Sequence, residues 1–136
     1  MTTLPTGVAG SRRIKAEALR RRTDFDRIYR QGRRFRGKFV TAIVMPGPIE
    51  PGLRVAYVVS RKVAKQAVRR NRLRRRLREA LRNLLRDHGL TGHPDIILIA
   101  SAEAPKASYW DLVAEVHELL GRARVWGQPA AAGGGG

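Results

Sequence analysis

A stripe of leucines between residues 65 and 88 is the longest periodic pattern in the chain. The leucines recur at intervals of three and four residues, which places their side chains on one side of a helix. The pattern predicts an amphipathic helix over residues 65–88 that stops at Gly89. The apolar side of this helix carries Leu73, Leu77, Leu81, Leu84 and Leu85.

Shorter apolar runs predict strands before and after this helix. Residues 39–45 and 54–60 are rich in β-branched and other apolar side chains, which favour extended structure. Residues 95–100 are apolar almost throughout, as is typical of a strand covered on both faces. Residues 33–35 are a candidate for a further short strand.

Two further helices are predicted from their start signals. Thr23 and Asp26 have the spacing of a capping box, which indicates a helix over residues 24–31. Ser108 and Asp111 have the same spacing at the start of a last helix. In each case a hydroxyl and a carboxylate would bind backbone N–H groups that the first helical turn leaves unpaired.

The order of these elements is α-β-β-α-β-α, which predicts an α+β fold with a small mixed sheet packed against helices. The strands at 54–60 and 95–100 flank the long helix, so we expect them to be parallel neighbours in a β-α-β unit. One domain is predicted over residues 23–124. Residues 1–22 are predicted to be a flexible basic arm, and residues 125–136 a disordered tail rich in alanine and glycine.

The charge of the chain points to a polyanionic partner. The 136 residues include 28 lysines and arginines but only 11 acidic residues, which gives a net charge of +17. The arginines concentrate in the long helix, where Glu79 is the only acid between Ser60 and Asp87. A solvated helix face normally mixes both signs, whereas a row of guanidinium groups suits phosphate. Nucleic acid is therefore the first candidate partner.

Several function classes are disfavoured by what the sequence lacks. It contains no cysteine, which excludes disulfides, thiolate metal sites and cysteine nucleophiles. No apolar run approaches the roughly 20 residues of a membrane span, and no secretory signal follows the basic residues near the N-terminus. We expect a cytoplasmic protein without a membrane partner. DNA is not expected as a partner, because the core needs the leucine side of the basic helix.

No catalytic constellation is found in the sequence. There are no paired carboxylates of the nuclease type and no nucleophile beside a base. The histidines are His88, His93 and His117; the first suits a helix C-terminus and the second a turn, so neither requires a metal. We expect no catalytic residues, no metal site and no cofactor bound by the protein residues alone.

The segment from Val59 to Glu79 resembles the signature of the protein subunit of bacterial ribonuclease P. In that family a strand ends in a basic pair, a loop follows, and a helix begins with Arg-Asn-Arg and continues with a basic pair and Arg-Glu. The resemblance extends over about residues 19–120, with two departures: Ala64 replaces a glycine of many members, and residues 101–103 lack a basic residue. The matching positions are Arg61, Lys62, Arg70, Asn71, Arg72, Arg74, Arg75, Arg78 and Glu79.

The resemblance implies a particular topology. Crossovers between parallel strands are right-handed in about 98% of cases. The family is built with the rare left-handed one, in a fold like domain 2 of ribosomal protein S5. We therefore predict a left-handed crossover through the helix at 65–88, against the general rule.

The resemblance also implies a function. The RNA subunit would remove the 5′ leader of precursor tRNA by Mg²⁺-dependent hydrolysis, while the protein binds the catalytic RNA and the leader. The implied contacts to the catalytic RNA are Arg70, Asn71, Arg72, Arg74, Arg75, Arg76, Arg78 and Arg82. The implied contacts to the leader are Phe25, Tyr29, Phe39, Arg61 and Lys62.

Two alternatives stay open at this point. Each of the rings of Phe25, Tyr29 and Phe39 can serve the core or offer a stacking surface to nucleotide bases. Composition alone also fits a small ribosomal protein. Co-purification with ribosomes, rather than with one structured RNA, would favour that second function.

Overall fold

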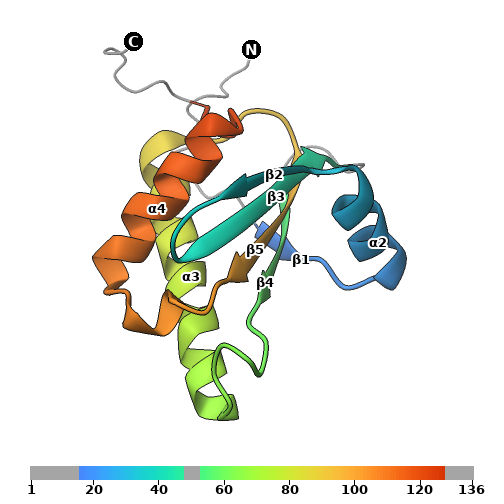
Figure 1. Cartoon of the computed structure of the whole chain (residues 1–136). Helices are drawn as coiled ribbons and strands as arrows, with labels where there is room; N and C mark the ends of the chain where they lie inside the picture. The colour runs from blue at the N-terminus through green and yellow to red at the C-terminus, as the bar shows by residue number, and fades with distance from the viewer. Residues whose placement is uncertain (1–15, 48–52, 128–136) are drawn as a thin grey trace.

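The computed structural model describes residues 16–47 and 53–127, which form a five-stranded sheet with helices on both faces (Figure 1). The elements are β1 (Ala16–Ala18), α2 (Arg22–Gln31), β2 (Arg33–Arg36), β3 (Val40–Pro46), β4 (Leu53–Val58), α3 (Ala67–His88), β5 (Pro94–Ala100), the 3-10 turn η1 (Ala104–Lys106) and α4 (Tyr109–Arg122). The strand order is β1-β4-β5-β3-β2, with β3 antiparallel to both of its neighbours. The predicted α+β class and mixed sheet are confirmed.

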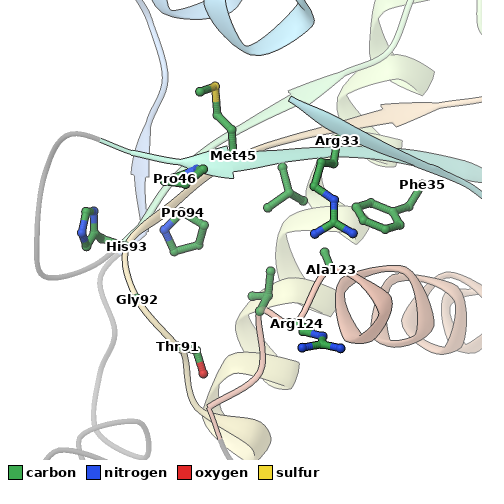
Figure 2. A pocket seen from close by; sticks show the side chains of 12 residues that line it. Arg33, Phe35, Met45, Pro46, Thr91, Gly92, His93, Pro94, Ala123 and Arg124 are labelled. Carbon is green, nitrogen blue, oxygen red and sulfur yellow. The ribbon is translucent and has the colours of Figure 1, made fainter. Parts of the chain in front are cut away.

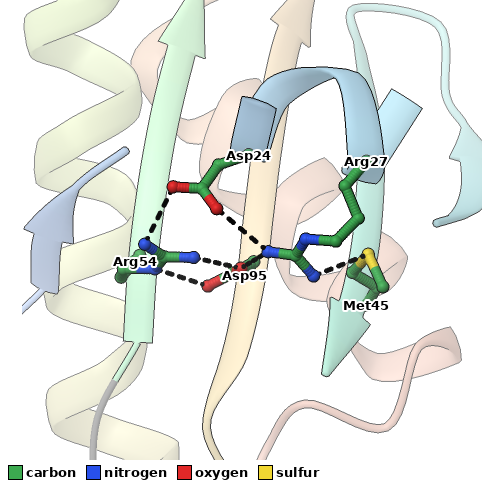
Figure 3. Close-up of polar contacts among 5 residues, drawn as sticks. All are labelled: Asp24, Arg27, Met45, Arg54 and Asp95. Carbon is green, nitrogen blue, oxygen red and sulfur yellow. Dashed lines mark hydrogen bonds and ion pairs between the residues drawn. The ribbon is translucent and has the colours of Figure 1, made fainter. Parts of the chain in front are cut away.

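The crossover from β4 through α3 to β5 joins parallel neighbours, as the sequence predicts. Figure 3 views the sheet from the side of α2: β4 and β5 run upward, β5 lies to the right of β4, and α3 lies behind the sheet. The chain therefore moves from β4 to its right-hand neighbour β5 through a helix behind the sheet, which makes the crossover left-handed. The general preference for right-handed crossovers therefore does not hold here.

The sheet separates two apolar cores. Alternate residues of β3, such as Val40 and Val44, point toward α3 and α4, where they pack with the buried leucine stripe. Their neighbour Ile43 points the other way and packs with Ile97 of β5 and Ile28 of α2. This alternation is the period of two expected of strands, and it fixes which side chains each helix can reach.

The ends of the helices differ in part from the predictions. The long helix begins at Ala67, two residues later than predicted. The capping box predicted at Thr23 is wrong, because α2 already begins at Arg22 and its N-cap, Arg21, makes no side-chain cap hydrogen bond. The capping box of Ser108 is confirmed, with both of its hydrogen bonds to Asp111 present.

Both predicted domain boundaries need correction. Residues 16–22 are part of the fold rather than of an arm, because β1 pairs with β4 and Leu19 is buried. At the other end, Val125 is buried and its carbonyl accepts a hydrogen bond from the backbone of Thr91. The rest of the predicted arm and tail lies outside the described residues.

Candidate nucleic-acid interface

The polar residues of α3 form two flanks, one on each side of the buried leucines. At about 100° per residue, one flank faces α4 and η1 and the other faces β4. We call Arg69, Arg72 and Arg76 the α4-side flank, and Asn71, Arg74 and Arg78 the β4-side flank. Arg75 and Arg82 are exposed on the outer side between them.

The α4-side flank lines a groove of about 850 Å³. Lys65, from the loop before α3, adds a further cation to the lining, and Pro105, from η1, adds an apolar surface. The lining holds four cationic side chains and no acid. A concave surface of this charge is suited to a phosphate backbone.

The β4-side flank is more tightly tied to the protein. The guanidinium of Arg78 lies 5.4 Å from the ring centre of Tyr57, close enough for a cation–π contact. Burial raises the pKa of Tyr57 to about 12, so this ring stays neutral at physiological pH. Arg74 donates a hydrogen bond of 2.7 Å to the side-chain oxygen of Asn71. These contacts hold the flank in one arrangement before any ligand binds.

Arg70 shapes the loop between β4 and α3. Its side chain is half-buried, and its Nη1 donates hydrogen bonds to the carbonyls of Ala64 at 3.0 Å and Lys65 at 2.7 Å. The position of Arg70 on the leucine side of the helix is thus explained by this loop. Ala64 is not among the residues with positive φ, so this backbone position does not require the glycine that many family members have.

Most of the charge on α3 is not neutralised within the protein. Among the described residues, the only ion pair that involves this helix joins Arg86 to its neighbour Asp87, at 3.9 Å on the surface. The other arginines of the helix lie side by side without an acidic partner. Such a ridge repels itself and is stabilised by an external polyanion.

Two aromatic residues meet on α2. The rings of Phe25 and Tyr29 stack with their centres 6.4 Å apart. Arg34 of β2 lies over Tyr29, with 5.7 Å between guanidinium and ring centre, and donates to the carbonyl of Tyr29 at 3.1 Å. Phe25 packs on the second core, whereas Tyr29 is 36% exposed. Tyr29 therefore offers a ring to a ligand, Arg34 adds a cation beside it, and Phe25 supports the ring.

Phe39 lies apart from this pair. It precedes β3, where it packs against the first core, and Lys38 lies over its ring at 5.3 Å. Its backbone N–H donates to the carboxylate of Glu115, which also accepts from Lys38 and Val40 and so fixes this loop to α4. In contrast, α2 reaches the opposite end of β3, where Arg27 contacts Met45.

The basic pair that follows β4 is exposed. Arg61 and Lys62 lie in the turn after this strand, and both side chains point to solvent. The strand register places the last residues of β4 and the first residues of β3 at the same end of the sheet, because both pair with the last residues of β5. Lys62 thus shares an end of the sheet with Phe39 rather than with α2.

An ion cluster that the sequence did not reveal attaches α2 to the sheet (Figure 3). Asp95, which is 1% exposed, accepts hydrogen bonds from Arg54 at 2.9 and 2.7 Å and from Arg27 at 2.7 Å. Asp24 completes the cluster at 3.1 Å from Arg54, and this hydrogen bond holds the pKa of Asp24 below its ordinary value. The sequence marks only one member of the cluster, since Asp95 is the one acid in an apolar run. Its pairing in register with Arg54 is seen only in the structure.

The histidines do not gather around a metal position. The rings of His88 and His117 lie 4.6 Å apart beside Trp126. Within residues 16–47 and 53–127, no three His, Asp or Glu side chains are grouped so that they could hold a metal ion. Over the same residues, no helix is both long and apolar enough to cross a bilayer.

The fold and the charged helix define a class: a small basic α+β domain with an exposed ridge of arginines that have no acidic partner among the described residues. The particular family is given by comparison with known proteins. The model of the ribonuclease P protein family matches residues 14–124, and the chain belongs to that family. Members of the family are protein subunits of the tRNA-processing ribonucleoprotein endoribonuclease.

Individual relatives agree with this assignment. The chain is 36% identical over 107 residues to the ribonuclease P protein component of Pseudanabaena, covering 79% of this chain and 90% of that one. Among solved structures, the ribonuclease P protein of Staphylococcus aureus is similar with a TM-score of 0.71 and 26% identity, covering 82% of this chain and 99% of that one. The protein from Thermotoga maritima gives 0.68 and 26%, covering 78% and 96%.

Proposed function

We propose that the outer surface of α3 binds the catalytic RNA of ribonuclease P. The observation that carries this proposal is the row of arginines without acidic partners, one flank of which lines a basic groove. Arg72, Arg76 and the exposed Arg75 would neutralise phosphates, and Arg70 would keep the loop before the helix in place. The full set of proposed contacts is Arg70, Asn71, Arg72, Arg74, Arg75, Arg76, Arg78 and Arg82.

A second surface, on α2, would bind the 5′ leader of precursor tRNA. The exposed ring of Tyr29, backed by Phe25 and flanked by Arg34, has the composition of a stacking position for a single-stranded base. Arg61, Lys62 and Phe39 would contact the leader further along, at the other end of the sheet. The leader would then run along the sheet from one group to the other.

The bond cleavage itself is assigned to the RNA. The protein would contribute binding and reduce the repulsion between the two RNAs, while Mg²⁺ would be held by RNA phosphates. Such an assembly would act in the cytoplasm on precursor tRNA.

Reconstitution tests the proposed function. The full chain is mixed with a bacterial ribonuclease P RNA at low Mg²⁺, and cleavage of precursor tRNA is followed. We expect accurate release of the 5′ leader only when both components are present. Cleavage by rigorously RNA-free protein, or no stimulation of the RNA, would contradict the proposal.

A further inference from the structure

A pocket of about 280 Å³ lies at the end of β3 and the start of β5, on the side of the sheet that α3 and α4 cover (Figure 2). Its walls come from the edge strand β2, from Pro46 and Pro94 at adjacent strand ends, and from the turn after α4. None of its residues belongs to the surfaces proposed above for the catalytic RNA or the leader. The pocket is therefore a separate feature of the molecule.

Two arginines reach this pocket from opposite sides. Figure 2 shows the guanidinium of Arg33 beside the ring of Phe35 and that of Arg124 below it. Arg33 lies 5.1 Å from the ring centre of Phe35. None of the lining residues is acidic, and neither arginine has an ion pair among the described residues. Two unneutralised cations at one small pocket favour an anion between them.

The backbone that presents Arg124 is the left-handed turn that ends α4. Among the described residues, Arg124 is the only one other than glycine with a positive φ, at 61°. The turn is held there by hydrogen bonds from Val125 to the carbonyl of Leu120 at 3.0 Å and from Thr91 to the carbonyl of Val125 at 2.8 Å. This left-handed residue directly follows the C-cap of α4, and it fixes the backbone from which the Arg124 side chain reaches the pocket.

We propose that this pocket binds one nucleotide of single-stranded RNA. The phosphate would lie between Arg33 and Arg124, and the base would pack against the apolar wall formed by Phe35, Pro46 and Pro94. The volume of about 280 Å³ lies just below the roughly 300–1,000 Å³ of small-molecule sites, so the pocket is matched to a single nucleotide and is too small for a duplex. Cations together with an aromatic wall distinguish a nucleotide from a simple anion. The site would give the protein a third RNA contact.

The test is a titration of the full chain with adenosine 5′-monophosphate, followed by NMR of backbone amides. Inorganic phosphate and a hexaglutamate peptide are titrated in parallel. We expect the nucleotide to shift the amides of Phe35, Thr91 and Ala123 and to bind at least tenfold more tightly than phosphate. Arg33→Gln and Arg124→Gly should each weaken binding about tenfold, the loss expected for one charge-assisted contact.

Matched controls remove the same charge outside the pocket. Arg36→Gln changes the same strand but the opposite face, and Arg122→Gln changes the last turn of α4. Both should bind the nucleotide as the parent does. Arg124→Gly also guards against misfolding, because glycine adopts positive φ without strain.

Three outcomes would overturn the inference. Equal affinity for phosphate and nucleotide would show a simple anion site, and equal affinity for the peptide would show a site for acidic protein segments. Shifts confined to α3 or α2 would show that the pocket is not used. These outcomes bear on the pocket alone. The proposed function is tested separately by reconstituted cleavage of precursor tRNA, which needs no free nucleotide in the pocket.

Discussion

Arg54 and Asp95 face each other on neighbouring parallel strands, and the guanidinium grips the buried carboxylate with hydrogen bonds of 2.9 and 2.7 Å. The same carboxylate accepts from Arg27 of α2, so one buried acid holds a helix to the sheet. This acid anchors the element that carries Tyr29. The attachment of α2 should therefore depend strongly on it.

Asp95→Asn should destabilise the fold by up to about 3–5 kcal/mol, because Arg54 and Arg27 lose the buried charge to which both donate and keep only the pairs to Asp24. Asp87→Asn is the control: it removes an exposed acid whose surface pair is worth less than about 1 kcal/mol. Urea unfolding of the two variants measures both values. Equal stability of Asp95→Asn and the parent would show that the cluster contributes nothing.

Acid should weaken the contribution of Asp24. Its hydrogen bond from Arg54 lowers the folded-state pKa below the ordinary value of 3.8. The stabilisation is therefore fully present above pH 3.8 and is lost as the pH falls through the lower, folded-state pKa. The difference in unfolding free energy between the parent and Asp24→Asn should be constant around neutral pH and should shrink as the pH falls below 3.8. A difference that grows on acidification would contradict the assigned shift.

The arginine ridge should determine the salt dependence of RNA binding. Arg72→Ala combined with Arg75→Ala should flatten the slope of log K against log salt for ribonuclease P RNA by roughly one to two units. Arg36→Ala combined with Arg122→Ala removes the same charge away from α3 and should leave this slope unchanged. An unaltered slope in the first pair would show that the ridge does not contact phosphate.

Tyr29→Ala should weaken binding of precursor tRNA by the roughly 1–3 kcal/mol of one stacked base, and leave binding of mature tRNA unchanged. The ring is 36% exposed, so the melting temperature should change little. Ile28→Ala, which empties a fully buried position on the same helix, should instead lower the melting temperature. If Tyr29→Ala melts early and loses both tRNAs equally, its role is structural.

The sequence predicted those parts of the fold that depend on local pattern. The leucine stripe, the three long strands and the capping box of Ser108 follow from periodicity and spacing, and all are present. The strand β1 was missed because three residues carry too little pattern to identify an edge strand. The handedness of the crossover came from family resemblance alone, since general physics favours the opposite hand.

The candidate site was harder to predict because it depends on pairings across the sheet. Phe25 and Tyr29 are four residues apart on one helix, so their contact could be inferred. Phe39 packs against a different core, and its position just before β3 gave no periodic signal of this. The cluster around Asp95 requires the register of two strands separated by a helix, and no local signal provides it.

The unpaired arginines of α3 have a consequence for the free subunit. The same helix buries its leucines in the main core. The repulsion among its arginines therefore lowers the free energy of unfolding directly. A polyanion that binds only the folded chain then behaves as a folding ligand, and stability rises with its concentration by mass action. Subunit made in excess of its RNA would be the less stable fraction, and the supply of RNA would set how much folded protein persists.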